Sequence, residues 1–223
     1  MNTEREEKLE AVLAQFIRPI KGIPFEVIMR SLCSASVIKF DTTEGKNDQT
    51  LELIAKAMRA VCRAIQKDPI QRPRPNEVGN DIEPFVINML KQRGLNASPP
   101  KTTTGKGKAT GYPDVKIEMS GLPIYLEVKT YAIKSHKTTM RSFYLSPSDD
   151  PKVTEDAYHI LVGFEVERTG NLYAPVAFEL VDLYGLECDM KFEFNSDNKR
   201  LYEHERILRS ERVPGPNTSD HDS

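Results

Sequence analysis

The sequence predicts a mixed α/β protein, of the α/β or α+β class, with a central mixed β-sheet flanked by helices and with further helices at the N-terminus. Three observations carry this prediction. Apolar residues recur at helical spacing in the first 93 residues, strand-like segments dominate from residue 111 to residue 181, and a helical pattern returns near residue 198. The 223 residues, of which 39% are hydrophobic and 29% charged, are enough to build a core.

The N-terminal third of the chain is expected to be helical. Residues 3–18 begin with Thr3 and Glu6 at capping-box spacing and carry apolar residues on one face. A short helix is expected over 25–32, and a longer one over 49–67. The buried stripe of the longer helix is Leu51, Ile54, Met58, Val61 and Ile65.

A proline-rich joint over 68–76 separates these helices from the rest of the chain. A helix over 77–93, ended by Gly94, precedes a flexible, basic Thr/Gly-rich loop and a β-hairpin over 111–131. Later elements are expected as strands at 141–145, 158–167, 173–181 and 190–194 and as a helix at 198–209. The expected parts of the chain are an N-terminal helical region over 1–72, a core over 73–210 and a disordered tail over 211–223.

The composition excludes several classes of protein. No apolar run approaches the ~18 residues that a membrane-spanning helix needs, and the N-terminus MNTEREEKLE lacks the profile of a signal peptide. The cysteines Cys33, Cys62 and Cys188 are widely spaced and form no CxxC pair, which favours ordinary thiols over a structural zinc site. We therefore expect a cytoplasmic protein.

Positive charge is concentrated in one segment. Eight Lys or Arg residues stand against three Asp or Glu residues between Lys101 and Arg141, a local net charge of +5 in a chain of net charge −2. A basic segment on an acidic protein favours local contact with a polyanion, although an ordinary solvated loop would have the same composition.

The hairpin GYPDVKIEMSGLPIYLEVKTY, residues 111–131, carries three charges on one face. A tight turn centred between Ser120 and Gly121 would place Asp114 opposite Glu127 on the neighbouring strand, about 5 Å away. Because side chains alternate along a strand, Lys129 would lie on the same face as Glu127.

Two carboxylates directly opposite each other repel, so this arrangement is unfavourable in a purely structural sheet. A divalent cation between them would reverse that effect, and hard oxygen ligands at this spacing suit Mg²⁺. With Lys129 stabilising developing charge, a metal held by Asp114 and Glu127 could hydrolyse a phosphodiester. The alternative is a solvated sheet face whose acids have no role.

The hairpin resembles the PD-(D/E)xK nuclease superfamily, with Pro113-Asp114 followed by Glu127-Val128-Lys129. Upstream, the segment GNDIEPFVINMLKQRG resembles the first core helix of that superfamily, which carries an active-site glutamate. The resemblance assigns this role to Glu83, with Glu77 as the alternative. The match covers roughly 76–180, and the helices before it look like the specific elaborations of type II restriction endonucleases.

This resemblance implies a restriction-endonuclease-like core and Mg²⁺-dependent, sequence-specific hydrolysis of double-stranded DNA to 5′-phosphate ends. It also implies a homodimer and a cognate DNA methyltransferase in the same system. Three alternatives stay open: another nuclease on this core, such as a repair nicking enzyme or a junction resolvase; a DNA-binding module without catalysis; and a structural sheet.

The basic segment is the expected DNA-contacting surface. Lys and Arg contact phosphates and guanine edges, and Thr contacts thymine methyl groups. The residues expected to face DNA are Lys106, Lys108, Lys134, Lys137, Thr138, Thr139 and Arg141.

Overall fold

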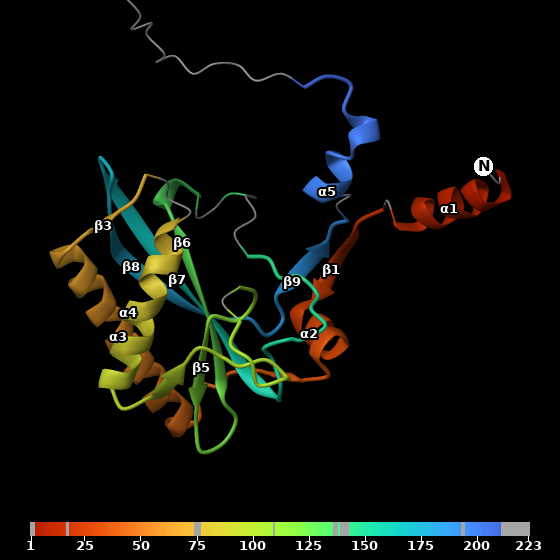
Figure 1. The fold of residues 1–223 in the computed structure, drawn as a ribbon. Coiled ribbons are helices and arrows are strands. Elements are labelled where there is room, and N and C mark those ends of the chain that lie inside the picture. Colours follow the sequence, from red (N-terminus) through yellow and green to blue (C-terminus); the bar gives the residue numbers. More distant parts are fainter. Residues whose placement is uncertain are drawn as a thin grey trace, which may run out of the picture. The chain divides into compact units, whose positions relative to one another are not determined.

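The computed structural model describes residues 3–16, 18–73, 77–108, 110–135, 138, 143–192 and 195–210 (Figure 1). The expected tail over 211–223 lies outside these residues. Among the helices in this part of the chain, none combines the length and the hydropathy needed to cross a membrane.

The central element is a mixed sheet of seven strands. Its main path runs β3–β8–β7–β6–β5–β4, and β2 pairs with the start of β7. The strands are β2 (Val37–Ile38), β3 (Ile70–Gln71), β4 (Asn96–Ser98), β5 (Val115–Glu118), β6 (Ile124–Tyr131), β7 (Ala157–Thr169) and β8 (Leu172–Asp182). The β6–β7 and β2–β7 pairs are parallel and the other pairs are antiparallel, so the predicted mixed α/β class is confirmed.

Helices α3 (Gly45–Lys67) and α4 (Val78–Gln92) pack together against this sheet, as Figure 1 shows. The predicted stripe of α3 supplies four fully buried residues to the core, and α4 adds Ile82, Val86 and Leu90. Helix α3 thus shares one core with α4 and the sheet, although the joint lies between them in sequence. The division of the chain near residue 72 stays a prediction.

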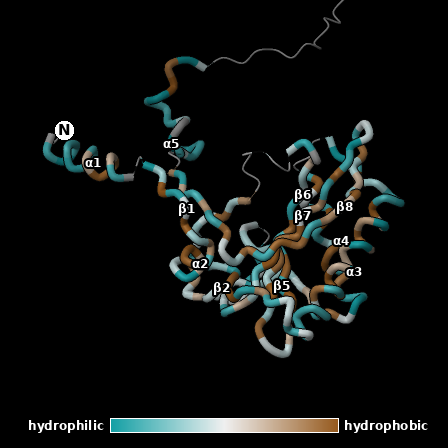
Figure 2. Tube along the Cα trace, turned by 180° about the vertical axis from the view of Figure 1, so that it is seen from behind, coloured by the Kyte–Doolittle hydropathy of each residue, from teal (hydrophilic) through white to brown (hydrophobic). Residues whose placement is uncertain are grey.

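A second hydrophobic cluster lies around helix α2 (Phe25–Cys33). Phe25 makes edge-on ring contacts with Tyr112, Phe143 and His159. Burial lowers the pKa of His159 to about 4, so this histidine is neutral at pH 7. In Figure 2 the hydrophobic stretches gather on the central strands and on the helices that cover them.

The remaining elements involve the two ends of the chain. Strands β1 (Ile20–Pro24) and β9 (Glu187–Met190) form a separate two-stranded sheet. The described residues before Lys21 and after Asp189 group apart from the compact unit Lys21–Asp189. They include helix α1 (Thr3–Phe16), the short helix α5 (Asn198–Leu201) and a 3₁₀ turn at His204–Arg206.

Three predicted elements need correction. Of the strand expected at 190–194, Met190 is the last residue of β9, and the described residues Lys191 and Phe192 are not in a strand. Residues 143–145, expected within a strand at 141–145, are not in a strand, because the partly buried Phe143 and Leu145 pack against the second cluster instead of pairing with a strand. The late helix expected over 198–209 is confined to the short helix α5 and the 3₁₀ turn that follows. The strands expected at 158–167 and 173–181 are confirmed as β7 and β8.

Candidate active site

The register of the β5–β6 hairpin agrees with the expected turn. Val115 pairs with Leu126 and Ile117 pairs with Ile124, so Asp114, one residue before β5, lies level with Glu127. The backbone N–H of Asp114 donates to the carbonyl of Leu126 at 3.2 Å. The N–H of Val128 donates to Asp114 Oδ2 at 2.8 Å, which fixes the carboxylate against β6.

The two faces of β6 are also as expected. Leu126 and Val128 are buried in the core with α3 and α4. Glu127 and Lys129 lie on the opposite face, where the Lys129 ammonium donates to Glu127 Oε1. Glu127 is only 3% exposed, and its Oε2 has no hydrogen-bond partner among the described residues.

Burial and charge together perturb these groups. Burial first, and then the nearby Asp114 carboxylate, raise the pKa of Glu127 to about 7, against the opposing effect of Lys129. Burial by itself would lower the pKa of Lys129, but Glu127 and Asp114 outweigh it and the pKa of the ammonium is raised. Perturbation by burial and a specific charge partner is typical of functional sites.

Glu83 on α4 joins this group of charges. Burial raises the pKa of Glu83 to about 7, and the next largest influence is the Asp114 carboxylate, offset by Lys129 and Lys152. Glu77, the alternative, lies directly before the first turn of α4. Its charge contributes to the raised pKa of Arg72. The structure therefore places Glu83, rather than Glu77, within the electrostatic reach of Asp114 and Lys129.

The carboxylates have the chemistry of a hard-cation site. Within the described part of the chain, no three His, Cys, Asp or Glu side chains gather closely enough to enclose a metal on their own. Mg²⁺, however, commonly takes only one or two carboxylates and keeps several waters. The unpartnered Glu127 Oε2 and the repulsion between Asp114 and Glu127 are the features that such a cation would relieve, so these residues fit Mg²⁺.

Lys152 is a site residue that the sequence did not reveal. It is 5% exposed, and its ammonium donates to the carbonyls of Gly111, at 2.7 Å, and Pro113, at 3.0 Å. Its charge acts on Asp114, Glu127 and Glu83. It follows Asp149-Asp150-Pro151 in a segment with no periodicity, so only its position in space identifies it.

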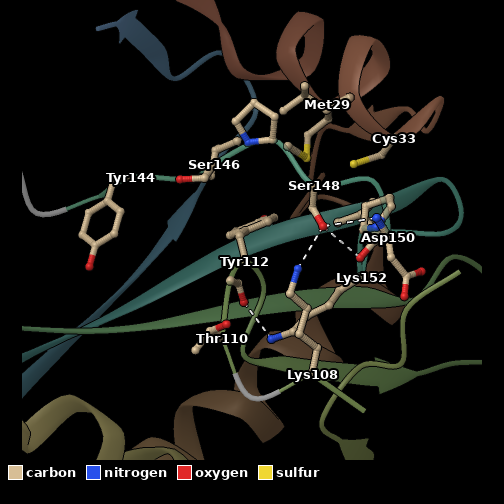
Figure 3. Close-up of a pocket in the computed structure, with 16 residues that line it drawn as sticks. Met29, Cys33, Lys108, Thr110, Tyr112, Tyr144, Ser146, Ser148, Asp150 and Lys152 are labelled. Atoms are coloured by element: carbon tan, nitrogen blue, oxygen red, sulfur yellow. Dashed lines mark hydrogen bonds between the residues drawn. The ribbon is translucent and has the colours of Figure 1, made fainter. Parts of the chain in front are cut away.

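A cavity of roughly 290 Å³ borders this lysine (Figure 3). Its lining residues include Tyr112, Tyr144, Met29, Lys108 and Lys152. Lys108 donates to Ser148 Oγ at 2.9 Å. One of the lysines expected to bind DNA thus lies beside the candidate active site.

The loop that carries Lys106 is folded into a closed turn. An isolated bridge joins Lys101 to Gly107, and Asp150 accepts hydrogen bonds from the hydroxyls of Thr103 and Thr104 at 2.6 and 2.8 Å. These hydrogen bonds lower the pKa of Asp150. The loop therefore presents Lys106, which is exposed, from a defined scaffold.

The other residues expected to face DNA follow β6. Lys134 is exposed on the 3₁₀ turn Ile133–Ser135, and the exposed Thr138 donates to the Ser135 carbonyl through its hydroxyl at 2.8 Å. Lys137, Thr139 and Arg141 lie outside the described residues. Their role in DNA contact stays a prediction.

Comparison with known proteins identifies relatives over most of the chain. The family model of the Type II restriction enzyme MjaV family matches residues 19–205. The Type II restriction enzyme MjaV of Methanocaldococcus jannaschii is 34% identical in an alignment that covers 91% of this chain and 94% of that protein. The chain therefore belongs to the Type II restriction enzyme MjaV family.

Proposed function

We propose that this type II restriction endonuclease hydrolyses double-stranded DNA at the site formed by Asp114, Glu127, Lys129 and Glu83, with Mg²⁺ as cofactor and 5′-phosphate ends as product. The observation that carries the proposal is the juxtaposition of the buried Glu127 and the half-buried Asp114 on one hairpin, with Lys129 on the same face. Membership in the family favours sequence-specific cleavage over nicking, junction resolution or binding without catalysis.

The chain's own groups have separable tasks. Asp114 and Glu127 would hold the cation, which would supply polarisation of the phosphoryl group and a lowered pKa for a water. The Lys129 ammonium, held by Glu127, orients the attacking water and stabilises charge on the phosphate. Glu83, whose pKa is raised to about 7, can exchange a proton near neutral pH. We propose that the sheet and α4 constitute a PD-(D/E)xK core.

Replacing either proposed metal ligand tests this assignment. Asp114→Ala and Glu127→Ala should abolish Mg²⁺-dependent plasmid cleavage while keeping or strengthening DNA binding, because repulsion between carboxylate and phosphate is relieved. Ca²⁺, which is larger and tolerates looser geometry, should support binding without cleavage. Glu118→Ala is the matched control, since Glu118 is an exposed acid on the same hairpin. Full cleavage by Asp114→Ala would refute the site.

DNA binding is proposed to depend on the basic segment between Lys101 and Arg141. Each lysine that contacts a phosphate adds about 0.9 to the slope of log affinity against log salt. The double substitution Lys106→Ala/Lys108→Ala should therefore flatten the slope by up to about 2 and weaken all sequences alike. Lys56→Ala/Lys67→Ala removes the same charge from exposed positions of α3 and should leave the slope unchanged. Equal slopes in the wild type and in both double variants would show that Lys106 and Lys108 do not contact DNA phosphates.

The proposed assembly is a two-fold homodimer, because one chain supplies one hairpin site and a duplex has two equivalent strands. The apolar stripe of α3 is buried within the protomer and is not available as an interface. Helix α1 leaves Leu9, Val12 and Leu13 exposed and is the candidate contact. A monomer in light scattering, both free and on DNA, would contradict this. A cognate methyltransferase is expected to protect the host DNA.

A further inference from the structure

Lys152 occupies an unusual place for a lysine. Its side chain is buried in the protein, and two of its three donor protons are taken by backbone carbonyls 41 and 39 residues earlier in the chain. Lysine is almost never fully buried unless its charge is paired. Here the compensating charges are the carboxylates Glu83, Asp114 and Glu127, all of which act on the ammonium.

The two carbonyls belong to the segment Gly111–Pro113, which directly precedes Asp114 and so positions it at the candidate site. Gly111 and Pro113 flank Tyr112, whose hydroxyl lies 2.6 Å from Nδ1 of His159. The side chain of Tyr112 is therefore anchored on the second cluster, and the backbone on either side of it is held by Lys152. Figure 3 shows Tyr112 and Lys152 together, with the hydrogen bond from Lys152 to the backbone.

We infer that Lys152 is a positioning residue for cleavage: it holds the Gly111–Pro113 backbone so that the Asp114 carboxylate meets the Val128 N–H and faces Glu127. The inference rests on the proposed metal site. Lys152 does not act on DNA directly, because its side chain is buried and its hydrogen bonds are directed to the backbone.

Removal of the ammonium would have two opposed consequences. It would leave the carbonyl of the buried Pro113 and the carbonyl of Gly111 without this donor, and it would release the segment that precedes Asp114. It would also remove a positive charge beside the carboxylates, which by electrostatics alone would strengthen cation binding. A positioning role and a purely electrostatic role therefore predict opposite changes in metal affinity.

The test compares Lys152→Met with wild type and with a control, Lys116→Met. Lys116 is a mostly buried lysine on strand β5, next to β6, and it forms ion pairs with Glu118 and Glu155. Three measurements are made on the full chain. They are the NMR shift and hydrogen exchange of the Val128 amide without metal, Ca²⁺ binding by calorimetry without DNA, and the Mg²⁺ dependence of single-turnover cleavage.

We expect Lys152→Met to accelerate exchange of the Val128 amide, to weaken Ca²⁺ binding and to raise the Mg²⁺ concentration at half-maximal cleavage. The effect on metal affinity should be about 10-fold to 100-fold, as for groups that orient metal ligands. The control should match wild type. An unchanged Val128 amide, or Ca²⁺ binding as tight as in wild type or tighter, would overturn the inference.

A thermal melt of each variant separates a purely structural role, which would lower the melting temperature while leaving the Mg²⁺ midpoint of the folded fraction unchanged. If Lys152→Met does not fold, the inference is tested by titrating the wild-type protein with Ca²⁺. Addition of Ca²⁺ should shift the Lys152 ammonium and Val128 amide signals with one midpoint, and movement of Val128 alone would overturn the inference. If the wild type binds no Ca²⁺, the proposed metal site fails, whereas the metal-free Val128 measurement still decides the role of Lys152.

Discussion

Strand β6 has two buried faces that perform different tasks. On one face, Leu126 and Val128 pack among apolar side chains in the core with α3 and α4. On the other, Glu127 is buried to the same degree, but its neighbours are Asp114 and Lys129, and Glu127 Oε2 has no partner among the described residues. Equal burial therefore stabilises the protein through one face and leaves charges in a low-dielectric site on the other.

The difference shows that the apolar face of β6 contributes stability and that the charged face contributes the chemical groups of the candidate site. Apolar burial contributes about 25 cal/mol for each Å² removed from water, without any partner of defined geometry. Buried carboxylates require partners, and the raised pKa values of Glu127 and Glu83 indicate that the partners within the chain do not fully compensate them. The comparison makes three predictions.

The largest expected effect is on cleavage, through the charged face. Lys129→Ala should lower the single-turnover cleavage rate by about 10²–10³, the loss typical of one electrostatic group in an active site. Lys129→Arg should not restore the rate, because a planar guanidinium replaces a compact ammonium poorly. Lys116→Ala, on the adjacent strand, is the matched control. Near-normal cleavage by folded Lys129→Ala would mean that both faces are structural.

The next effect is on stability, through the apolar face. Leu126→Ala should lower the free energy of unfolding by about 3 kcal/mol, since it removes a fully buried side chain and leaves a cavity. Urea unfolding with an unchanged m-value would measure the loss. Cleavage per folded molecule should fall far less than in Lys129→Ala. A stability loss below about 1 kcal/mol would contradict the assigned role of this face.

The smallest effect is a gain in stability on the charged face. In wild type without metal, the pKa of Glu127 is about 7 in the folded protein and lies near its ordinary 4.5 in the unfolded chain. The folded state is therefore increasingly penalised as the pH rises from 4.5 to about 7; the penalty is absent below 4.5 and complete above 7. Glu127→Gln should be about 2 kcal/mol more stable than wild type at pH 8, with no gain at pH 4.

Urea unfolding in EDTA at both pH values measures this difference. Glu118→Gln, an exposed acid on the same hairpin, should show no gain at either pH. Equal stability of Glu127→Gln and wild type at pH 8 would show that the Glu127 carboxylate is already compensated within the chain.

Local patterns were sufficient for the hairpin and its acids. The turn at Ser120-Gly121 and the two-residue period of a strand predicted the level of Asp114 with Glu127, and the register agrees. The resemblance of its segment to a catalytic helix implied the role of Glu83, and Glu83 lies on α4 as expected. Both predictions depended on residues close together in sequence.

Other features depended on contacts that no local pattern encodes. The loop over 101–108 was expected to be flexible, but Asp150 closes it through hydrogen bonds to Thr103 and Thr104. The segment 143–145 has the pattern of a strand, yet the partly buried Phe143 packs edge-on against Phe25 instead of joining the sheet. In each case the deciding partner lies more than 40 residues away in the chain.

The sequence by itself determined the fold class, the two faces of β6 and the three charges of the hairpin, because strand and helix periods act over neighbouring residues. The tertiary structure decided which further groups join them. Glu83 reaches the site because α4 packs on the sheet, and Lys152 reaches it by hydrogen bonds to Gly111 and Pro113. Burial and charge depend on all neighbours in space, so the electrostatics of the site exist only in the folded chain.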